Sequence, residues 1–179
     1  LYYSKGGSVK EMSKIIARGI NSIDGVEAKL RTVPEVSALT KPLEDQIPES
    51  GDLYASLIDL ERCQGLVLGS PTRFGNMAAP LKYFIDSLSP LWLKGTMENK
   101  PASVFTSSGS IHGGNETTLL TMQLPLLHLG MLIMGVPYST PSLIATKSGG
   151  TPYGASHIGG DNNQNDLTSD EKSICFAQG

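Results

Sequence analysis

The stretch GLVLGSPTRFGNMAAPLKYFIDSL, from Gly65 to Leu88, decides the fold of this chain. Its first part, Gly65 to Gly69, is an apolar run with the length of a strand. Its last part, Asn76 to Leu88, has the apolar spacing of a helix. Between them lies Ser-Pro-Thr-Arg-Phe-Gly, which contains a proline, an arginine and an aromatic residue that a plain connector does not need. The pattern therefore predicts a buried strand, a functional loop and a helix.

Apolar strands and amphipathic helices alternate along the rest of the chain. Strands are expected at Leu1–Ser4, Val26–Val33, Gly65–Gly69, Pro101–Ser108 and Gly130–Ser139. Helices are expected at Ser8–Ile23, Tyr54–Leu60, Asn76–Leu88, Asn115–Leu129 (kinked at Pro125) and Thr168–Phe176, with a loop at Thr40–Gly51. Because most strands are uniformly apolar, the sheet should be parallel and covered on both faces. We predict one α/β domain over residues 1–179, with a doubly wound five-stranded parallel sheet in three αβα layers.

The composition restricts the function further. The chain has 179 residues, of which 39% are hydrophobic and 17% charged, as in a globular domain. Its formal net charge of −3 offers no basic field, so we expect no nucleic-acid partner. Because the sequence opens with Leu1 and no initiator methionine, we expect part of the first strand, and the end of the last helix, to lie outside it.

Cys63 and Cys175 are the two cysteines, and they lie far apart without a CxxC or Cys/His cluster. This pattern argues against a zinc site or a disulfide framework and suits a reducing, cytoplasmic compartment. We expect both thiols to be inert and no metal to be bound. The longest apolar runs fall short of the roughly 20 residues that a membrane span needs. We therefore expect no membrane span.

Three loops rich in Gly, Ser and Thr follow predicted strands and lead into helices: Ser4–Val9, Ser70–Met77 and Ser107–Thr117. In a parallel α/β sheet such loops share the carboxyl edge, where ligands bind. The first loop has Gly6 and Gly7 for close backbone approach, with hydroxyls and helix amides that suit a phosphate. It has neither Walker A nor GxGxxG spacing, so a cofactor phosphomonoester fits it better than a triphosphate. An ordinary helix-capping turn is the alternative.

The second and third loops suit a planar heterocycle. Pro71 stiffens the second loop, Phe74 can lie against a ring, and Arg73 can face negative charge. A surface arginine beside a core-edge phenylalanine is the alternative. The third loop adds glycine amides that could meet the polar edges of the same ring.

Four stretches carry a resemblance to a known family: LYYS at the start, GSPTRFGNMAAPLKYFID, ASVFTSSGS followed by HGG, and GGTPYGAS at Gly149–Ser156. Over nearly the whole chain, the sequence resembles the WrbA family of flavodoxin-like NAD(P)H:quinone oxidoreductases. The resemblance implies a flavodoxin-like fold, bound FMN, NADH or NADPH as reductant, a quinone substrate and a homotetramer built as a dimer of dimers.

The resemblance also assigns roles to residues. It implies that Trp92 lines the cavity where nicotinamide or quinone stacks, and that His128 lies at the flavin site. We expect Arg73 and His128 to be the catalytic residues, with Arg73 stabilising negative charge on reduced flavin. The implied FMN contacts are Ser4, Lys5, Gly6, Gly7, Ser8 and Val9 at the phosphate, and Pro71, Thr72, Arg73, Phe74, Ser107, Ser108, Gly109, Ser110, His112, Gly113 and His128 at the ring.

Three positions depart from the family pattern. Gly6 stands where relatives often carry an aromatic residue implicated in nucleotide binding, and Ser8 stands where a histidine is common. Ile111-His112 lengthens the third loop. Farther along, His157 is expected at the surface, and Asp161–Asp166 forms a polar loop without metal-ligand spacing.

The expected reaction is a ping-pong transfer, in which NAD(P)H reduces FMN and a quinone then takes two electrons from the same stacking site. No Ser/His/Asp or Cys/His triad is evident. Three alternatives stay open: an FMN-dependent azo- or nitroreductase, a one-electron carrier of the flavodoxin type, and a flavin-binding regulatory protein.

Overall fold

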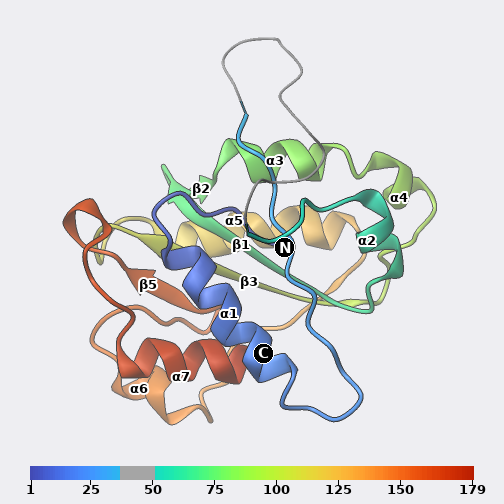
Figure 1. Cartoon of the computed structure of the whole chain (residues 1–179). Helices are drawn as coiled ribbons and strands as arrows, with labels where there is room; N and C mark the ends of the chain where they lie inside the picture. The colour runs from blue at the N-terminus through green and yellow to red at the C-terminus, as the bar shows by residue number, and fades with distance from the viewer. Residues whose placement is uncertain (37–50) are drawn as a thin grey trace.

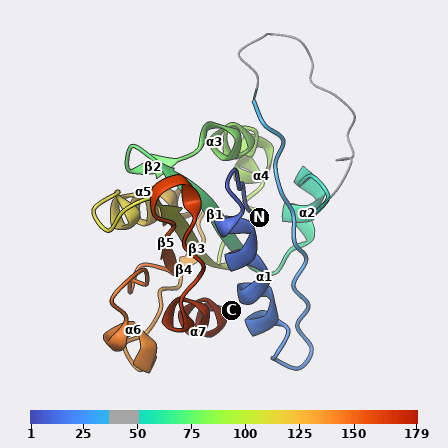
Figure 2. The same ribbon diagram turned by 60° about the vertical axis from the view of Figure 1, so that its left-hand side comes forward.

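Strand β1 (Leu66–Arg73) lies in the middle of the sheet in the computed structural model, which describes residues 1–36 and 51–179. The other strands are β2 (Asn76–Met77), β3 (Pro101–Ser108), β4 (Leu132–Ile133) and β5 (Ser156–Ile158). The helices are α1 (Ser8–Ile20), α2 (Leu57–Arg62), α3 (Ala79–Asp86), α4 (Ser89–Leu93), α5 (Asn115–His128), α6 (Pro141–Ala145), α7 (Ser169–Gln178) and a 3₁₀ turn, η1 (Asp161–Asn163). Figures 1 and 2 show their arrangement. The expected loop at Thr40–Gly51 lies outside the described residues, apart from Gly51.

The sheet is doubly wound, as predicted. β1 pairs in parallel with β3, and β3 pairs on its other side with β4 and β5. The start of the chain lies on the opposite side of β1, where the Tyr3 amide donates to the Gly69 carbonyl at 2.9 Å. Beyond it, Tyr2 forms a parallel bridge with Thr32. The winding direction reverses between the chain start and β1, which is the position where flavodoxin-like sheets bind their ligand.

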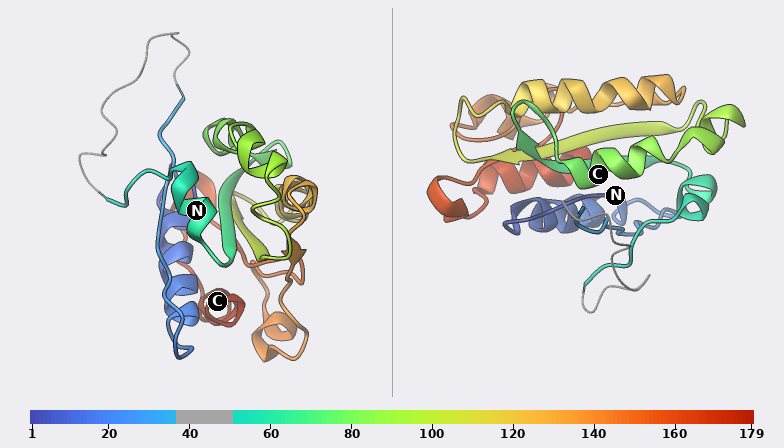
Figure 3. Two further views of the ribbon diagram at one scale, coloured as in Figure 1. Left: turned by 90° about the vertical axis from the view of Figure 1, so that its right-hand side faces the viewer. Right: turned by 90° about the horizontal axis from the view of Figure 1, so that it is seen from above.

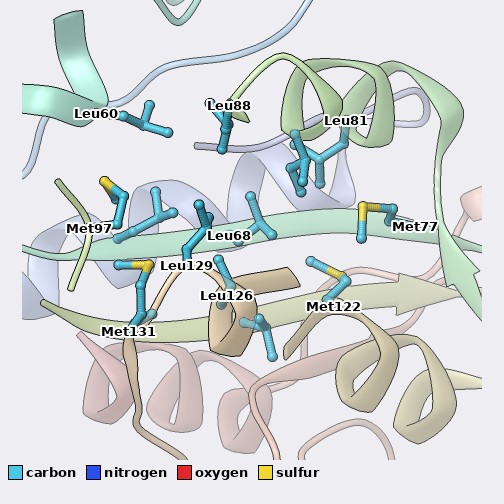
Figure 4. Packing of buried hydrophobic residues seen from close by; sticks show 14 of the residues in the cluster. Leu60, Leu68, Met77, Leu81, Leu88, Met97, Met122, Leu126, Leu129 and Met131 are labelled. Carbon is cyan, nitrogen blue, oxygen red and sulfur yellow. The ribbon is translucent and has the colours of Figure 1, made fainter. Parts of the chain in front are cut away.

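Two hydrophobic clusters cover the two faces of this sheet. One cluster lies between the sheet and α3, α4 and α5, and it includes Leu68, Leu81 and Met122 (Figure 4). The other cluster lies beneath α1 and α7 and includes Met12 and Ile174. Figure 3 shows the sheet between these helices. The predicted αβα layering is therefore correct. Within the described residues, no helix is both long and apolar enough to cross a membrane.

The segment after β1 differs from the expected loop and helix. β1 continues to Arg73, and the chain then turns back through Phe74 (φ 52°) and Gly75 (φ 76°) into the short antiparallel strand β2. Two successive positive φ angles are typical of the tight hairpin turn that matches strand twist. The helix consequently begins at Ala79 instead of Asn76. The sheet is mostly parallel, with this one antiparallel pair.

The fifth strand position also differs from the prediction. The expected strand Gly130–Ser139 pairs with β3 only at Leu132–Ile133, because the chain leaves the sheet at Val136, whose amide donates to the Pro152 carbonyl. β5 then fills the remaining length of the edge by pairing with the end of β3. The expected strand Val26–Val33 is likewise reduced to the bridge at Thr32.

Candidate functional site

The second and third loops lie against each other at the carboxyl edge of the sheet. The Thr121 hydroxyl donates to the Gly75 carbonyl at 3.2 Å, and the hydroxyls of Thr72 and Thr118 are 2.5 Å apart. A Cβ built on Gly114 would lie 3.2 Å from the Gly75 Cα. This close approach places the β1–β2 hairpin beside the start of α5.

The first loop joins the third loop through the segment that follows β5. In that segment, the Gly159 amide donates to the Ser108 carbonyl at 2.7 Å. Farther along, the Asn163 side chain contacts the first loop: it accepts from the Ser8 hydroxyl at 2.6 Å and donates to the Gly6 carbonyl at 2.5 Å. All three loops therefore gather at one edge of the sheet, on the left in Figure 1.

The first loop leaves the beginning of α1 open to an anion. Gly7 is the N-cap, with φ 92° and no side-chain cap, so the first amides of α1 have no partner within the helix. The helix dipole adds partial positive charge there. Ser4 accepts from the Lys10 amide at 3.2 Å, and Lys5 is exposed. The donor set fits a phosphate.

The second loop presents its side chains at the tip of the hairpin. Arg73 and Phe74 are both exposed, and an Arg73 Nη1 atom donates to the Thr72 carbonyl at 2.7 Å. Below them, the Ser70 hydroxyl is buried and accepts from the Ala78 amide at 2.8 Å. Burial, followed by the hydrogen bond to Glu35, raises the pKa of Tyr3, while the nearby charge of Arg73 opposes the rise. Arg73 thus brings positive charge near the Tyr3 side chain.

The third loop contains a buried oxygen without a partner. Ser107 and Ser108 are buried at the end of β3, and Gly114 (φ 90°) is the N-cap of α5 without a side-chain cap. Asn115, the first residue of α5, is buried, and its Oδ1 atom has no hydrogen-bond partner among the described residues. Since a buried acceptor of this kind is costly to leave unpaired, it fits a ligand that brings an N–H group.

Ile111 and His112, the residues that lengthen the third loop, are exposed.

Trp92 and His128 lie away from this cluster. They line a cavity of about 400 Å³ together with Asp86, Ser89 and Pro125. His128 is the last residue of α5, whereas the third loop meets the first residue, so at 1.5 Å per residue the two ends are about 20 Å apart. In Figure 1 the α4 helix that carries Trp92 lies on the right, opposite the loop cluster. A single chain therefore does not bring these two side chains to the loops.

His157 is buried, with 1% of its surface exposed, so the expectation that it lies at the surface is wrong. Its Nδ1 atom is 3.0 Å from Oε2 of Glu171, which is fully buried, and its Nε2 atom is 3.2 Å from the Asn165 carbonyl. Burial alone would raise the pKa of Glu171, but hydrogen bonds from His157 and from the Thr168 and Gly149 amides lower it to about 2. The buried His157–Glu171 pair therefore links β5 to α7.

The two thiols are unpaired, and neither is poised as a nucleophile. Burial raises the pKa of Cys175 to about 12, and it also raises the pKa of Cys63. A raised pKa leaves little thiolate near neutral pH.

Two residues at the loop cluster were missed by sequence reasoning. Asn115 follows two glycines at a helix start, which is a local signal that could have been used. Asn163 gives no such signal, because its contacts with Gly6 and Ser8 join segments that are far apart in the sequence.

Comparison with known proteins agrees with this geometry. The family model described as NADPH-dependent FMN reductase matches residues 3–142. The chain is 40% identical over 167 residues to a protein of Syntrophobacter fumaroxidans named NAD(P)H dehydrogenase (quinone), covering 89% of this chain and 82% of the relative. A protein of the same name from Geobacter sulfurreducens is 41% identical, with the same coverage.

Solved structures support the fold. A WrbA-like flavodoxin from Agrobacterium tumefaciens superimposes with a TM-score of 0.61 at 20% identity, covering 99% of this chain and 89% of that one. An archaeal flavodoxin gives a TM-score of 0.62 at 18% identity, covering 99% and 90%. These likenesses establish the flavodoxin-like fold, and the family match covers most of the chain. The resemblance to WrbA-type quinone oxidoreductases is confirmed, and this chain belongs to the NADPH-dependent FMN reductase family.

Proposed function

We propose that this chain is an FMN-dependent enzyme that uses NADH or NADPH to reduce quinones by two electrons. When bound, FMN supplies the redox chemistry, accepting hydride from the nicotinamide and releasing two electrons to the quinone. The observation that carries the proposal is the meeting of three Gly- and Ser-rich loops where the winding of the sheet reverses. The names of the relatives at 40% and 41% identity support the reaction.

The first loop holds the phosphate of FMN in this proposal. The amides of Gly7, Ser8 and Val9 face the anion, and the dipole of α1 stabilises its charge. Gly6 gives close approach without a side chain, while Ser4 and Lys5 border the phosphate. The N-terminus of α1, where the N-cap Gly7 provides no side-chain acceptor, supports this role.

The second and third loops hold the ring. Pro71, Thr72 and Phe74 form one wall, and the Arg73 guanidinium stabilises negative charge at the pyrimidine edge of the reduced ring. Asn115 offers its unpaired Oδ1 atom to a ring N–H group. The remaining proposed contacts are Ser107, Ser108, Gly109, Ser110, His112 and Gly113.

We further propose a homotetramer, a dimer of dimers, in which Trp92 and His128 of one copy serve the flavin of another. The distance of about 20 Å along α5 supports an origin in a second copy, because neither side chain can reach the loops of its own chain. Exposed apolar side chains on α5 and α4 also support assembly: Leu120, Leu124, Leu127, Trp92 and Leu93.

Residues 1–179 act as one flavodoxin-like unit in the cytoplasm in this proposal. The likeness to flavodoxin-like structures extends over 99% of the chain, which supports a single unit. The unpaired thiols of Cys63 and Cys175 support a reducing compartment.

The first test measures steady-state oxidation of NADH and NADPH by the FMN-loaded protein in the presence of benzoquinone. The second measures the molar mass of the protein in solution by light scattering. We expect quinone-dependent turnover by a particle of four copies. Turnover with nitro or azo compounds but not with benzoquinone would favour the alternative reductase. Oxidation that requires a separate reductase would favour an electron carrier, and a lack of any turnover would favour a regulatory flavoprotein.

A further inference from the structure

We propose that Asn163 is a positioning residue that braces the Gly6–Gly7 turn for the phosphate of FMN, an inference that rests on the proposed flavin site. Asn163 lies in η1, on the loop between β5 and α7. Its side chain makes two hydrogen bonds to the first loop, although 157 positions separate it from Gly6. The phosphate loop is therefore held in shape from the far end of the chain.

The two hydrogen bonds act on the flexible part of the loop. Asn163 Oδ1 accepts from the Ser8 hydroxyl at 2.6 Å, and its Nδ2 donates to the Gly6 carbonyl at 2.5 Å. Within the first loop, the two glycines, Gly6 and Gly7, have the most backbone freedom. Fixing them in one conformation costs conformational entropy. Because the hydrogen bonds of Asn163 order these residues before the ligand binds, less conformational entropy is lost on binding. The affinity of the loop for its ligand is therefore higher.

The bond to Gly6 also orients an amide. In a trans peptide the carbonyl of one residue and the N–H of the next point in opposite directions, and no described peptide is cis. Because Asn163 holds the Gly6 carbonyl on its own side, the Gly7 N–H points away from Asn163. That amide is thereby left for an anion at the start of α1, while the Ser8 hydroxyl supports the loop.

Gly6 and Asn163 also share one space. A Cβ at Gly6 would lie 3.0 Å from Asn163 Cγ and 3.1 Å from its Nδ2. A Cβ at position 6 would require the Asn163 side chain to shift by a few tenths of an ångström, so glycine at this position leaves room for the two hydrogen bonds.

The base of the loop that carries Asn163 is firmly held. His157 lies between the Glu171 carboxylate and the Asn165 carbonyl, and the Asn165 amide donates to the Gly159 carbonyl at 2.9 Å. These groups fix both ends of the loop, whereas residues 161–164 at its tip are exposed. Hydrogen bonds thus hold the base of the loop whose tip carries Asn163.

The test compares Asn163→Gly with Asn162→Gly. Both residues have positive φ angles, 58° and 56°, so glycine fits both backbones and adds the same freedom. No hydrogen bond of the Asn162 side chain occurs among the described residues, so the control removes no contact with the first loop. The first measurement is amide hydrogen exchange of residues 4–9 in the flavin-free protein. We expect about tenfold faster exchange in Asn163→Gly and less than about twofold change in Asn162→Gly.

The second measurement is equilibrium binding of FMN and of riboflavin, which lacks the phosphate. Asn163→Gly should weaken FMN about tenfold and leave riboflavin within about twofold, whereas Asn162→Gly should change neither. Unchanged exchange in Asn163→Gly, equal effects of the two variants, an equal loss of FMN and riboflavin, or tighter FMN binding would each overturn the inference. If the unsubstituted protein binds no FMN, the proposed function fails, and the flavin-free exchange still decides whether the brace exists.

Discussion

Two pairs of helices begin in opposite ways. α1 and α5 start after Gly7 and Gly114, which have φ angles of 92° and 90°, and neither N-cap glycine provides a side-chain cap. α2 and α7 start with complete capping boxes, Ser56 with Asp59 and Thr168 with Glu171. α1 and α5 begin directly after loops of the cluster, whereas α2 and α7 do not follow any of the three loops.

The difference shows where the fold keeps its amides available. A capping box satisfies the orphan amides of a helix from within and is a purely structural solution. A glycine start leaves those amides for an external acceptor, at a cost in stability that a bound anion can offset. The starts of α1 and α5 are thus prepared for ligand, whereas those of α2 and α7 are already capped.

The largest expected effect is a loss of folding stability at α7, one of the two helices with a capping box. Glu171→Ala removes the α7 capping box and leaves buried His157 and the Gly149 amide without their partner. We expect the free energy of unfolding to fall by about 4 kcal/mol. Urea unfolding measures it, with Glu116→Ala as the matched control, because Glu116 lies exposed in the first turn of α5. A loss below about 1 kcal/mol would contradict the structural role of the pair.

The acid dependence of stability comes next in size. The pKa of Glu171 falls from 4.5 to about 2 on folding, so its contribution is complete above about pH 4.5 and is lost as the pH falls toward 2. The expected loss is about 3 kcal/mol. Urea unfolding over this range should show a steeper pH dependence in the natural protein than in Glu171→Gln. Identical pH profiles would show that the carboxylate is not the group responsible.

A substitution at Gly7, the N-cap of α1, should change the affinity for FMN. Gly7→Asp places a negative charge where the phosphate is proposed to bind, and we expect FMN affinity to fall about 100-fold while riboflavin binding changes little. Gly25→Asp is the control, since Gly25 also has a positive φ (82°) and, like Gly7, has no atom within 4 Å of a built Cβ. Flavin fluorescence titration measures both. Unchanged FMN affinity in Gly7→Asp would remove α1 from the site.

The smallest effect sharpens the contrast. Ser56→Ala removes the α2 cap and should lower the free energy of unfolding by about 1 kcal/mol. FMN affinity should not change, because α2 lies outside the loop cluster. A change in flavin binding without a change in stability would reverse the assignment of the two helix classes.

The sequence predicted the layers and the loops better than the details between them. Apolar runs at Gly65–Gly69 and Pro101–Ser108 identified β1 and β3, because buried parallel strands leave a strong local pattern. The hairpin at Phe74 was missed, since a positive φ at phenylalanine has no compositional signal. The expected strand Gly130–Ser139 was mostly wrong, because the edge of β3 is shared by two segments.

The site was predictable where its residues follow strands and unpredictable where tertiary contacts form it. The three loops lie together because parallel strands end at one edge. Asn163 and the His157–Glu171 pair depend on how the last segment folds back, which no local spacing encodes. The position of Trp92 at the far end of α5 is likewise a property of the folded chain.

A crystal structure of the protein grown with FMN tests the central claim most directly. We expect the phosphate within hydrogen-bond distance of the Gly7, Ser8 and Val9 amides, with Trp92 of a neighbouring copy against the flavin ring. A phosphate bound elsewhere, or a flavin in the cavity between Trp92 and His128 of a single chain, would contradict it.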